Sequence, residues 1–242
     1  METLTNAFEN GKEGFNYTAI EYLGDGRGWT AGRVGFTSGT GDLLTVLERY
    51  RDQWAYRGLI STIPTLQRIS ALPVCDRRGR DDISQLGNLP HDWVLAAEGD
   101  LAFRRVQDLV TYEMYLWPSS RFASSVSVHS PLGQAIFYDT IVQHGWQKTE
   151  SDINIARIIQ LTNTTSPAQG EAEYLSQFLR VRRSMLCCYR EDMTWPSSAG
   201  RVADLQRALE QGNLALNQDI YLESIGVVVG KAGTYSSEGK RI

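Results

Sequence analysis

Residues 21–30 read Glu-Tyr-Leu-Gly-Asp-Gly-Arg-Gly-Trp-Thr, and the interpretation of the whole chain starts from this stretch. Its three glycines bracket one acid, Asp25, and one base, Arg27. Strand-like runs at 17–23 and 29–36 flank the glycines, which permit a tight turn and the close approach of a ligand to the backbone. The pattern predicts a hairpin whose turn presents Asp25. Two interpretations of that carboxylate stay open: it performs chemistry, or it is a charged decoration of the turn.

Length and composition are those of an ordinary globular protein. With 242 residues, the chain can bury a substantial core, as one large domain or as two lobes. The formal net charge is -4 and the mean hydropathy is -0.30. A mild acidic excess does not favour nucleic acid as a partner, but it favours a cationic substrate. The six Trp and eleven Tyr suit a protein core, and equally the apolar faces of sugar rings.

The sequence contains no evident membrane or targeting segment. No apolar run approaches the length of a membrane span, and no signal-peptide pattern follows Met1. We therefore expect no membrane partner, and either a cytoplasmic protein or the mature form of a secreted one. The three cysteines and three histidines lack metal-ligand spacing, and there is no nucleophile motif, P-loop or dinucleotide fingerprint. The sequence thus predicts neither a metal nor a cofactor.

Apolar spacing predicts helices in the first part of the chain. A short helix at 3–9 ends near Gly11, and a helix at 43–54 has Asp42 at its N-cap position. A further apolar segment at 59–69 is interrupted by a proline. The architecture that this pattern indicates is mainly helical, with one small sheet near the N-terminus.

The middle of the chain alternates polar and apolar stretches. Residues 75–91 are rich in Arg, Asp and Gly, which is typical of a long loop. A long helix is predicted at roughly 100–117, with Pro118 as its end and a polar connection at 119–129.

Clear start and stop signals mark the helices of the C-terminal part. Ser130 and Pro131 open a helix that Gly145 closes. Two more helices are predicted at 174–189 and 202–209, and the polar tail from residue 232 is expected to fray.

Two of these helices carry a charge on their apolar stripe. Asp139 lies on the inward face of the helix that follows Ser130, and Arg182 lies on the inward face of the next long helix. A charge among apolar residues is costly unless it is paired. We therefore expect Asp139 and Arg182 to meet in a buried ion pair, an arrangement that fixes register or tunes a neighbouring group.

Several acids and hydroxyls are candidate site residues, each with a simpler alternative. Glu9 and Asp25 could act as the general acid and base of an inverting glycosidase, whose carboxyls stand roughly 6.5–9.5 Å apart; alternatively both are solvated. Thr30 could hold a water molecule, or merely favour a strand. Asp42 could bind a cationic group, although a helix cap is the stronger interpretation.

Taken together, these segments resemble the bacterial chitosanases of glycoside hydrolase family 46. The similarity is strongest at 19–42, where the glycine stretch is followed by Gly-Phe-Thr-Ser-Gly-Thr-Gly-Asp. Looser matches lie at 137–145, which reads Phe-Tyr-Asp-Thr-Ile-Val-Gln-His-Gly, and at 165–170, 174–182 and 212–217. The similarity is weakest at 75–98. The resemblance implies a lysozyme-like fold: a single catalytic domain, 1–242, of two helical lobes joined by the helix near 100–117, with a cleft between them.

The same resemblance implies roles for named residues. Glu9 would be the general acid, Asp25 the general base, and Thr30 would help to position the attacking water. An arginine–aspartate–arginine network behind the catalytic pair would comprise Arg182, Asp139 and Arg201. Sugar contacts would fall on Asn10, Arg27, Thr40, Asp42, Tyr115, His144 and Gly145.

The resulting expectation is a secreted, monomeric endo-chitosanase that inverts the anomeric carbon. Chitosan is a polyamine, so a carboxylate such as Asp42 could select its deacetylated units, and an inverting route needs neither nucleophile nor metal. Three alternatives remain: a lysozyme- or chitinase-like hydrolase of acetylated sugars, a chitosan-binding protein without turnover, and a helical interaction protein.

Overall fold

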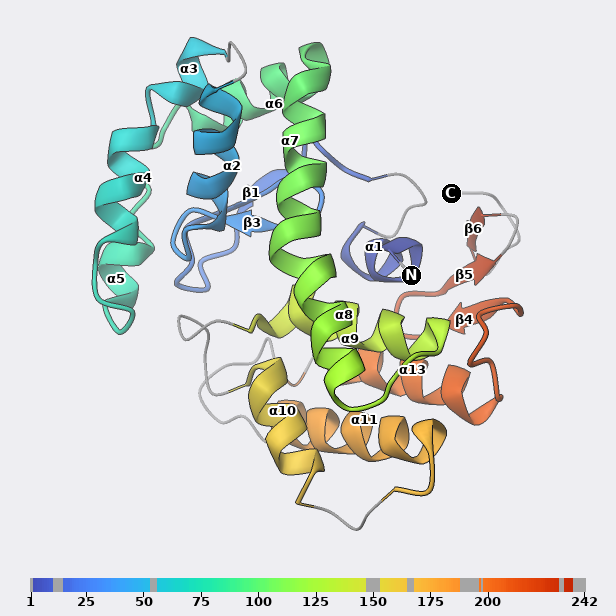
Figure 1. The fold of residues 1–242 in the computed structure, drawn as a ribbon. Coiled ribbons are helices and arrows are strands. Elements are labelled where there is room, and N and C mark those ends of the chain that lie inside the picture. The colour runs from blue at the N-terminus through green and yellow to red at the C-terminus, as the bar shows by residue number, and fades with distance from the viewer. Residues whose placement is uncertain are drawn as a thin grey trace. The chain divides into compact units, whose positions relative to one another are not determined.

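A computed structural model describes residues 2–10, 15–52, 56–146, 153–164, 168–187, 196, 198–230 and 233–236. The chain divides into two compact units. One consists of Phe15–Met114, and the other combines Met1–Gly14 with Tyr115–Ile242. Figure 1 shows the elements of both units.

The unit formed by Phe15–Met114 holds the glycine stretch. Its elements are β1 (Ile20–Tyr22), β2 (Trp29–Ala31), β3 (Phe36–Thr37), α2 (Asp42–Arg51), α3 (Arg57–Ile60), α4 (Ile63–Ser70), α5 (Arg77–Arg80), α6 (Leu89–Gly99) and α7 (Leu101–Thr111). The strands form an antiparallel sheet in the order β1-β2-β3, with Tyr22 opposite Trp29 across the glycine turn. The predicted hairpin is therefore confirmed. The second strand-like run divides into β2 and β3, since Gly32 and Gly35 adopt positive φ angles between them.

An aromatic cluster forms the core of this unit. Trp93 and Phe103 meet edge to face with ring centroids 4.8 Å apart, and Tyr50 lies 4.7 Å from Phe103. The Trp93 indole Nε1 also donates to the Tyr17 carbonyl at 2.9 Å, which ties α6 to the segment that enters the sheet.

The loop predicted at 75–91 is only partly correct. Asp76 accepts a hydrogen bond from the Gly79 N–H and caps the single turn of α5, and α6 begins at Leu89. Local Arg, Asp and Gly content concealed these elements, because the loop interpretation rested on polarity alone.

The long helix predicted at 100–117 does not end at Pro118. Asp100 caps α7 by accepting from the Ala102 N–H at 2.8 Å, and the π-helix η1 (Tyr112–Leu116) then leads into α8 (Trp117–Ser125). Pro118 lies in the first turn of α8, where a proline displaces no helical hydrogen bond. The expected polar connection at 119–129 is therefore helical as far as Ser125.

The other unit packs helices around one core. Its elements are α1 (Glu2–Asn10), α8, α9 (Pro131–His144), α10 (Ile155–Thr162), α11 (Glu171–Cys187), α13 (Ala199–Glu210), β4 (Ile220–Leu222), β5 (Val227–Gly230) and β6 (Gly233–Ser236). The rings of Phe137 and Phe178 stack in this core at 4.7 Å. The Ser130 cap and the closing Gly145 are confirmed, since Ser130 accepts from the Gly133 N–H and Gly145 has a φ of 71°.

Three features of this unit differ from the prediction. The strands β4, β5 and β6 form a second antiparallel sheet, so the expectation of a single sheet was wrong. The tail expected to fray includes β6, and residues 237–242 lie outside the described residues. Helix α10 was also missed. Across the ranges that the structure describes, no helix combines the length and apolarity needed to cross a membrane.

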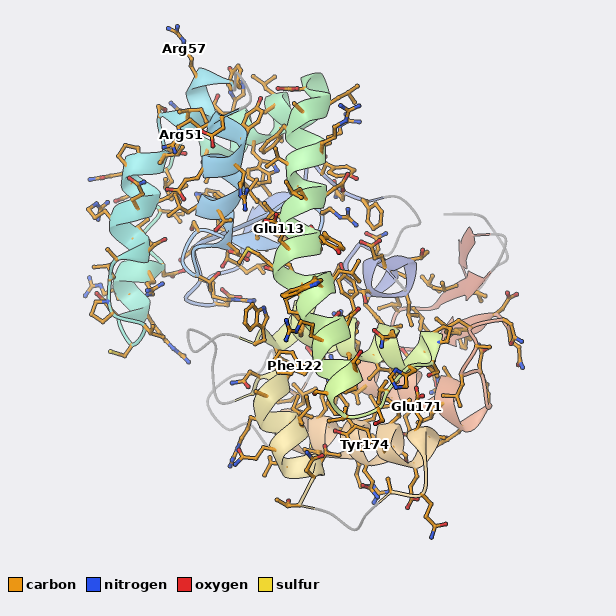
Figure 2. The ribbon with its side chains drawn as sticks, viewed as in Figure 1. Arg51, Arg57, Glu113, Phe122, Glu171 and Tyr174 are labelled. Carbon is orange, nitrogen blue, oxygen red and sulfur yellow. The ribbon has the colours of Figure 1, made fainter. Side chains whose placement is uncertain are left out.

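A carboxylate links the start of α11 to the start of α9. Glu171, labelled in Figure 2, accepts from the backbone N–H groups of Ser130 at 2.9 Å and His129 at 3.1 Å. Burial works against ionisation of this carboxyl, but the hydrogen bonds from Ser130 and His129 outweigh burial. The pKa of Glu171 therefore lies below its ordinary value.

We expect Glu171→Ala to lower the free energy of unfolding at neutral pH by about 1–2 kcal/mol, because two backbone donors lose a charged acceptor. A lowered folded-state pKa stabilises the protein above the unfolded-state pKa of about 4.3, and this contribution is lost as the pH falls through the folded value. Urea unfolding at pH 7 and pH 3 tests both points. The exposed Glu210→Ala is the control, and a pH-independent loss in Glu171→Ala would contradict the assignment.

Candidate functional site: two carboxylates held by arginine

The glycine turn adopts a backbone that only glycine accommodates easily. Gly24, Gly26 and Gly28 have φ angles of 67°, 86° and 72°. A side chain at Gly28 would also meet the Ser38 hydroxyl, since a Cβ there would lie 2.2 Å from its Oγ. These positive φ angles explain why the stretch needs three glycines, and they place Asp25 within the turn.

Arg27 holds the Asp25 carboxylate. Its backbone N–H donates to Oδ1 at 3.1 Å, while Nε and Nη2 donate to Oδ2 at 2.9 and 2.6 Å. The Asp25 side chain is 12% exposed and that of Arg27 is 38% exposed. The prediction assigned Arg27 to a sugar contact. That contact stays a prediction; in the structure the Arg27 guanidinium fixes the direction of the Asp25 carboxylate.

Thr30 carries a hydroxyl that is suited to a ligand or water. It lies in β2, paired with Glu21 on one side and Thr37 on the other. Its Oγ1 is buried, and among the residues that the structure describes it has no hydrogen-bond partner. Buried hydroxyls are usually hydrogen-bonded, so the hydrogen-bonding capacity of this atom is unused within the described part of the chain.

Asp42 is not the N-cap that the sequence predicted. Gly41 occupies that position with a φ of 97°, and Asp42 is the first residue of α2. Its Oδ1 accepts from the N–H groups of Thr37 at 2.7 Å and Leu43 at 2.9 Å, and from the Thr40 hydroxyl at 2.9 Å. Asp42 is 7% exposed, and its carboxylate organises the second glycine cluster, residues 38–42 (Ser-Gly-Thr-Gly-Asp). The Thr40 hydroxyl, a predicted sugar contact, serves that same arrangement.

The predicted ion pair between Asp139 and Arg182 is confirmed in the unit that contains α9. Arg182 Nη1 donates to Asp139 Oδ2 at 2.9 Å, and both side chains have no exposure. Arg201 donates to the other oxygen, Oδ1, from Nε at 2.9 Å and Nη2 at 2.6 Å. Burial opposes ionisation of Asp139, but Arg201 and Arg182 outweigh burial and hold the pKa of this carboxyl below its ordinary value.

Glu9 joins this network through Arg201. Arg201 Nη1 donates to Glu9 Oε1 at 2.6 Å, and the Glu9 side chain is 30% exposed. The guanidinium also lies over the Phe8 ring, 4.8 Å from its centroid. Burial alone would lower the pKa of Arg201, but Asp139 and Glu9 raise it above its ordinary value. The arginine is therefore a permanent cation between two carboxylates.

His144 belongs to the same network. Its side chain is 1% exposed, and its Nε2 accepts from Arg182 Nε at 3.2 Å. The sugar contact of His144 stays a prediction; in the structure its ring is buried and contacts Arg182. Sequence reasoning missed Thr140 and Gln143, which also accept from Arg182. Their position beside Asp139 and His144 on α9 was the only available signal.

The structure describes two of the remaining predicted sugar contacts, but not the side chain of the third. Gly145 ends α9, and its carbonyl accepts from the Ile155 N–H at 3.2 Å. Tyr115 lies in η1 and packs, partly buried, against the core. The side chain of Asn10 lies outside the described residues.

Other candidate sites are less suited to a cationic ligand or to a metal. A shallow hollow is lined by Arg51 and Arg57, both labelled in Figure 2, together with Ile60 and Ser61. Two arginines there would repel a polyamine. In the described part of the chain, no group of three or more His, Cys, Asp or Glu side chains could hold a metal ion.

We expect Asp139→Asn to lower the free energy of unfolding by about 3–5 kcal/mol, because removing one partner of a buried network leaves buried cations without their anion. The lowered folded-state pKa means that this contribution is complete above about pH 4, the unfolded aspartate's pKa, and shrinks as the pH falls. Chemical unfolding at several pH values measures it.

The control is Asp52→Asn, since Asp52 is 69% exposed and lies 3.7 Å from Arg51. Its loss should stay below about 1 kcal/mol, as is usual for surface pairs. Equal losses in the two variants would contradict the assignment.

Comparison with known proteins identifies the family. The family model for glycosyl hydrolase family 46 matches residues 3–220. A chitosanase of Bacillus subtilis (strain 168) is 33% identical over 231 residues, which cover 92% of this chain and 80% of that protein. A chitosanase of Streptomyces sp. (strain N174) is 34% identical over 87% of this chain and 72% of its own length.

Solved structures agree with the sequence comparison. The Gynuella sunshinyii GH46 chitosanase in complex with chitotetraose has a TM-score of 0.82 and 33% identity, covering 92% of this chain and 93% of that one. A mutant chitosanase of Bacillus subtilis MY002 complexed with six GlcN has a TM-score of 0.81 and 31% identity, covering 97% and 95%. The mainly helical fold with its small N-terminal sheet is thus the fold of these enzymes. The chain belongs to glycosyl hydrolase family 46.

Proposed function

We propose that this protein is an endo-acting chitosanase that cleaves β-1,4 bonds between glucosamine units with inversion. Glu9 serves as general acid and Asp25 as general base, and Thr30 holds the attacking water. The observation that carries the proposal is that both acids, in a chain of this hydrolase family, are held by arginines and remain partly exposed. An acid that reacts with a polymer must be both oriented and accessible.

The proposed reaction is a single displacement. Protonated Glu9 gives its proton to the glycosidic oxygen as the bond to the anomeric carbon breaks. Asp25 takes a proton from a water molecule, whose oxygen attacks the anomeric carbon from the opposite face. The products are a new reducing end of α configuration and a free 4-hydroxyl. Proton exchange with solvent then restores Glu9 and Asp25. Room for the water requires carboxyls roughly 6.5–9.5 Å apart during the reaction.

The charge network assists Glu9 after proton transfer. The carboxylate that forms on Glu9 carries a negative charge, and the nearby Arg201 guanidinium stabilises it. Asp139 fixes Arg201 through two hydrogen bonds, and Arg182 in turn fixes Asp139. The network therefore holds the Arg201 cation in one orientation beside Glu9, and the other charges of the network, on Asp139 and Arg182, are fixed as well.

The Asp25 end of the reaction relies on the glycine turn. Arg27 directs the carboxylate, and the Thr30 hydroxyl offers a hydrogen bond to the water. Asn10, Arg27, Thr40, Tyr115, His144 and Gly145 remain proposals for the sugar contacts. Of these, His144 would act through Arg182, because its ring is buried.

Chitosan fits the charge of the protein. A formal net charge of -4 favours a polycation. Asp42 would recognise an amine, and an acetylated unit would leave that carboxylate without its cation. Relatives have been solved with chitotetraose and with six GlcN. We further propose that the protein acts outside the cell, where it would meet a long polymer. We also propose that it acts as a monomer.

We expect Glu9→Gln and Asp25→Asn each to lower kcat on chitosan by about 10²–10⁴-fold, the usual contribution of a general acid or base. KM should change little, because each substitution keeps the side-chain shape. Reducing-end release under saturating substrate measures kcat. Glu98→Gln, at an exposed position, should match the wild type. Wild-type turnover in Glu9→Gln would remove this residue as the acid.

Two alternatives lead to different substrates or to none. A lysozyme- or chitinase-like enzyme would release more reducing ends from acetylated chitin than from chitosan. A binding protein would release none from either polymer while still retaining chitosan. We expect release from chitosan to exceed release from chitin, and the opposite order would overturn the proposed specificity.

A further inference from the structure

The base of the glycine turn is closed by a carboxylate from a distant segment. Asp81 Oδ1 accepts from the Gly28 N–H at 2.8 Å, and Oδ2 accepts from the Tyr22 hydroxyl at 2.7 Å. Tyr22 is the last residue of β1, and Gly28 directly precedes β2. One carboxylate thus holds both sides of the turn that carries Asp25.

Asp81 is itself fixed by its neighbour Arg80. The Arg80 side chain is largely buried and donates to the carbonyls of Ser70, Leu72 and Pro73, and to that of Gly39. Carbonyl oxygens around a buried guanidinium satisfy its donors and hold it in one orientation. Residues 80 and 81 therefore have little freedom to move against the rest of the unit.

The two glycine clusters and this segment pack without spare room. The Gly39 N–H donates to the Arg27 carbonyl at 2.8 Å. A Cβ at Gly39 would lie 2.7 Å from the Arg80 carbonyl oxygen and 2.8 Å from that of Arg27. Closely packed backbone atoms move together, so a shift of residue 81 would also move Gly28 and the neighbouring Arg27, whose guanidinium holds Asp25.

We infer that Asp81 is a positioning residue for Asp25, because its carboxylate fixes the turn from which Asp25 reaches the attacking water. The inference rests on the proposed role of Asp25 as general base. It assigns a function to the segment at 75–98, where the sequence resemblance is weakest. Asp81 acts through hydrogen bonds, so its charge is dispensable: an asparagine could accept from Gly28 and donate to the Tyr22 oxygen.

The test compares kcat and KM on a chitosan oligomer for Asp81→Ala, Asp81→Asn and Tyr22→Phe. Asp81→Ala should lower kcat by about 10–10²-fold with KM little changed, since small displacements of a reacting group carry penalties of this size. Asp81→Asn should restore kcat to within about threefold of the wild type, because both hydrogen bonds can re-form. Tyr22→Phe, which keeps the ring, should show a smaller fall in kcat.

The matched control is Asp82→Ala, since the hydrogen bond that Asp82 accepts from the Ser84 N–H is local, two residues away. It should leave kcat unchanged. Wild-type kcat in Asp81→Ala would overturn the inference, and so would an Asp81→Asn variant as impaired as the alanine variant, because charge and not position would then matter. If Asp81→Ala does not fold, unchanged kcat in Tyr22→Phe overturns it.

Asp25→Asn separates this inference from the proposed function. Full turnover in Asp25→Asn would contradict the role of Asp25, whatever Asp81 does. An inactive Asp25→Asn together with a fully active Asp81→Ala would leave the proposed function standing and remove only the inference about Asp81.

Discussion

The Asp139 carboxylate, held between Arg182 and Arg201 with no exposure to solvent, is the interaction on which the larger unit depends. A buried carboxylate on its own would be strongly destabilising, and so would either arginine without it. The residues come from α9, α11 and α13, and Glu9 adds α1 through Arg201. Four helices therefore share one electrostatic requirement, and satisfying it places a cation against Glu9.

In the other unit, the proposed base is held by a residue close to it in the sequence. Asp25 is held by Arg27 two residues away, within a turn whose glycines adopt positive φ angles that other residues rarely adopt. The surrounding supports come from farther along the chain: Asp42 organises the second glycine cluster, and Asp81 closes the first. Arg201 thus contacts Glu9 and Arg27 contacts Asp25, and further carboxylates hold the surroundings of each acid in place.

The sequence predicted those features that leave a periodic or paired signal. The hairpin around Asp25 followed from its glycines, and the contact of Asp139 with Arg182 followed from opposite charges on two apolar stripes. Glu9 could be assigned as the general acid only by resemblance, because its hydrogen bond with Arg201 joins residues that are 192 positions apart in the sequence. Pro118 misled because a proline is as acceptable in a first helical turn as after a last one. The second sheet was missed since strands of three and four residues carry too little alternation, and Asp81 gave no local sign of its distant partners.

The most direct test of the central claim is the stereochemistry of the first product, followed by proton NMR as the wild-type protein cleaves a chitosan oligomer. Two carboxyls that act as acid and base, with water attacking from the opposite face, must yield an α reducing end before mutarotation mixes the anomers. Prompt appearance of the α-anomer is the result that this account predicts. Prompt appearance of the β-anomer would contradict it, because retention would require a covalent glycosyl-enzyme intermediate.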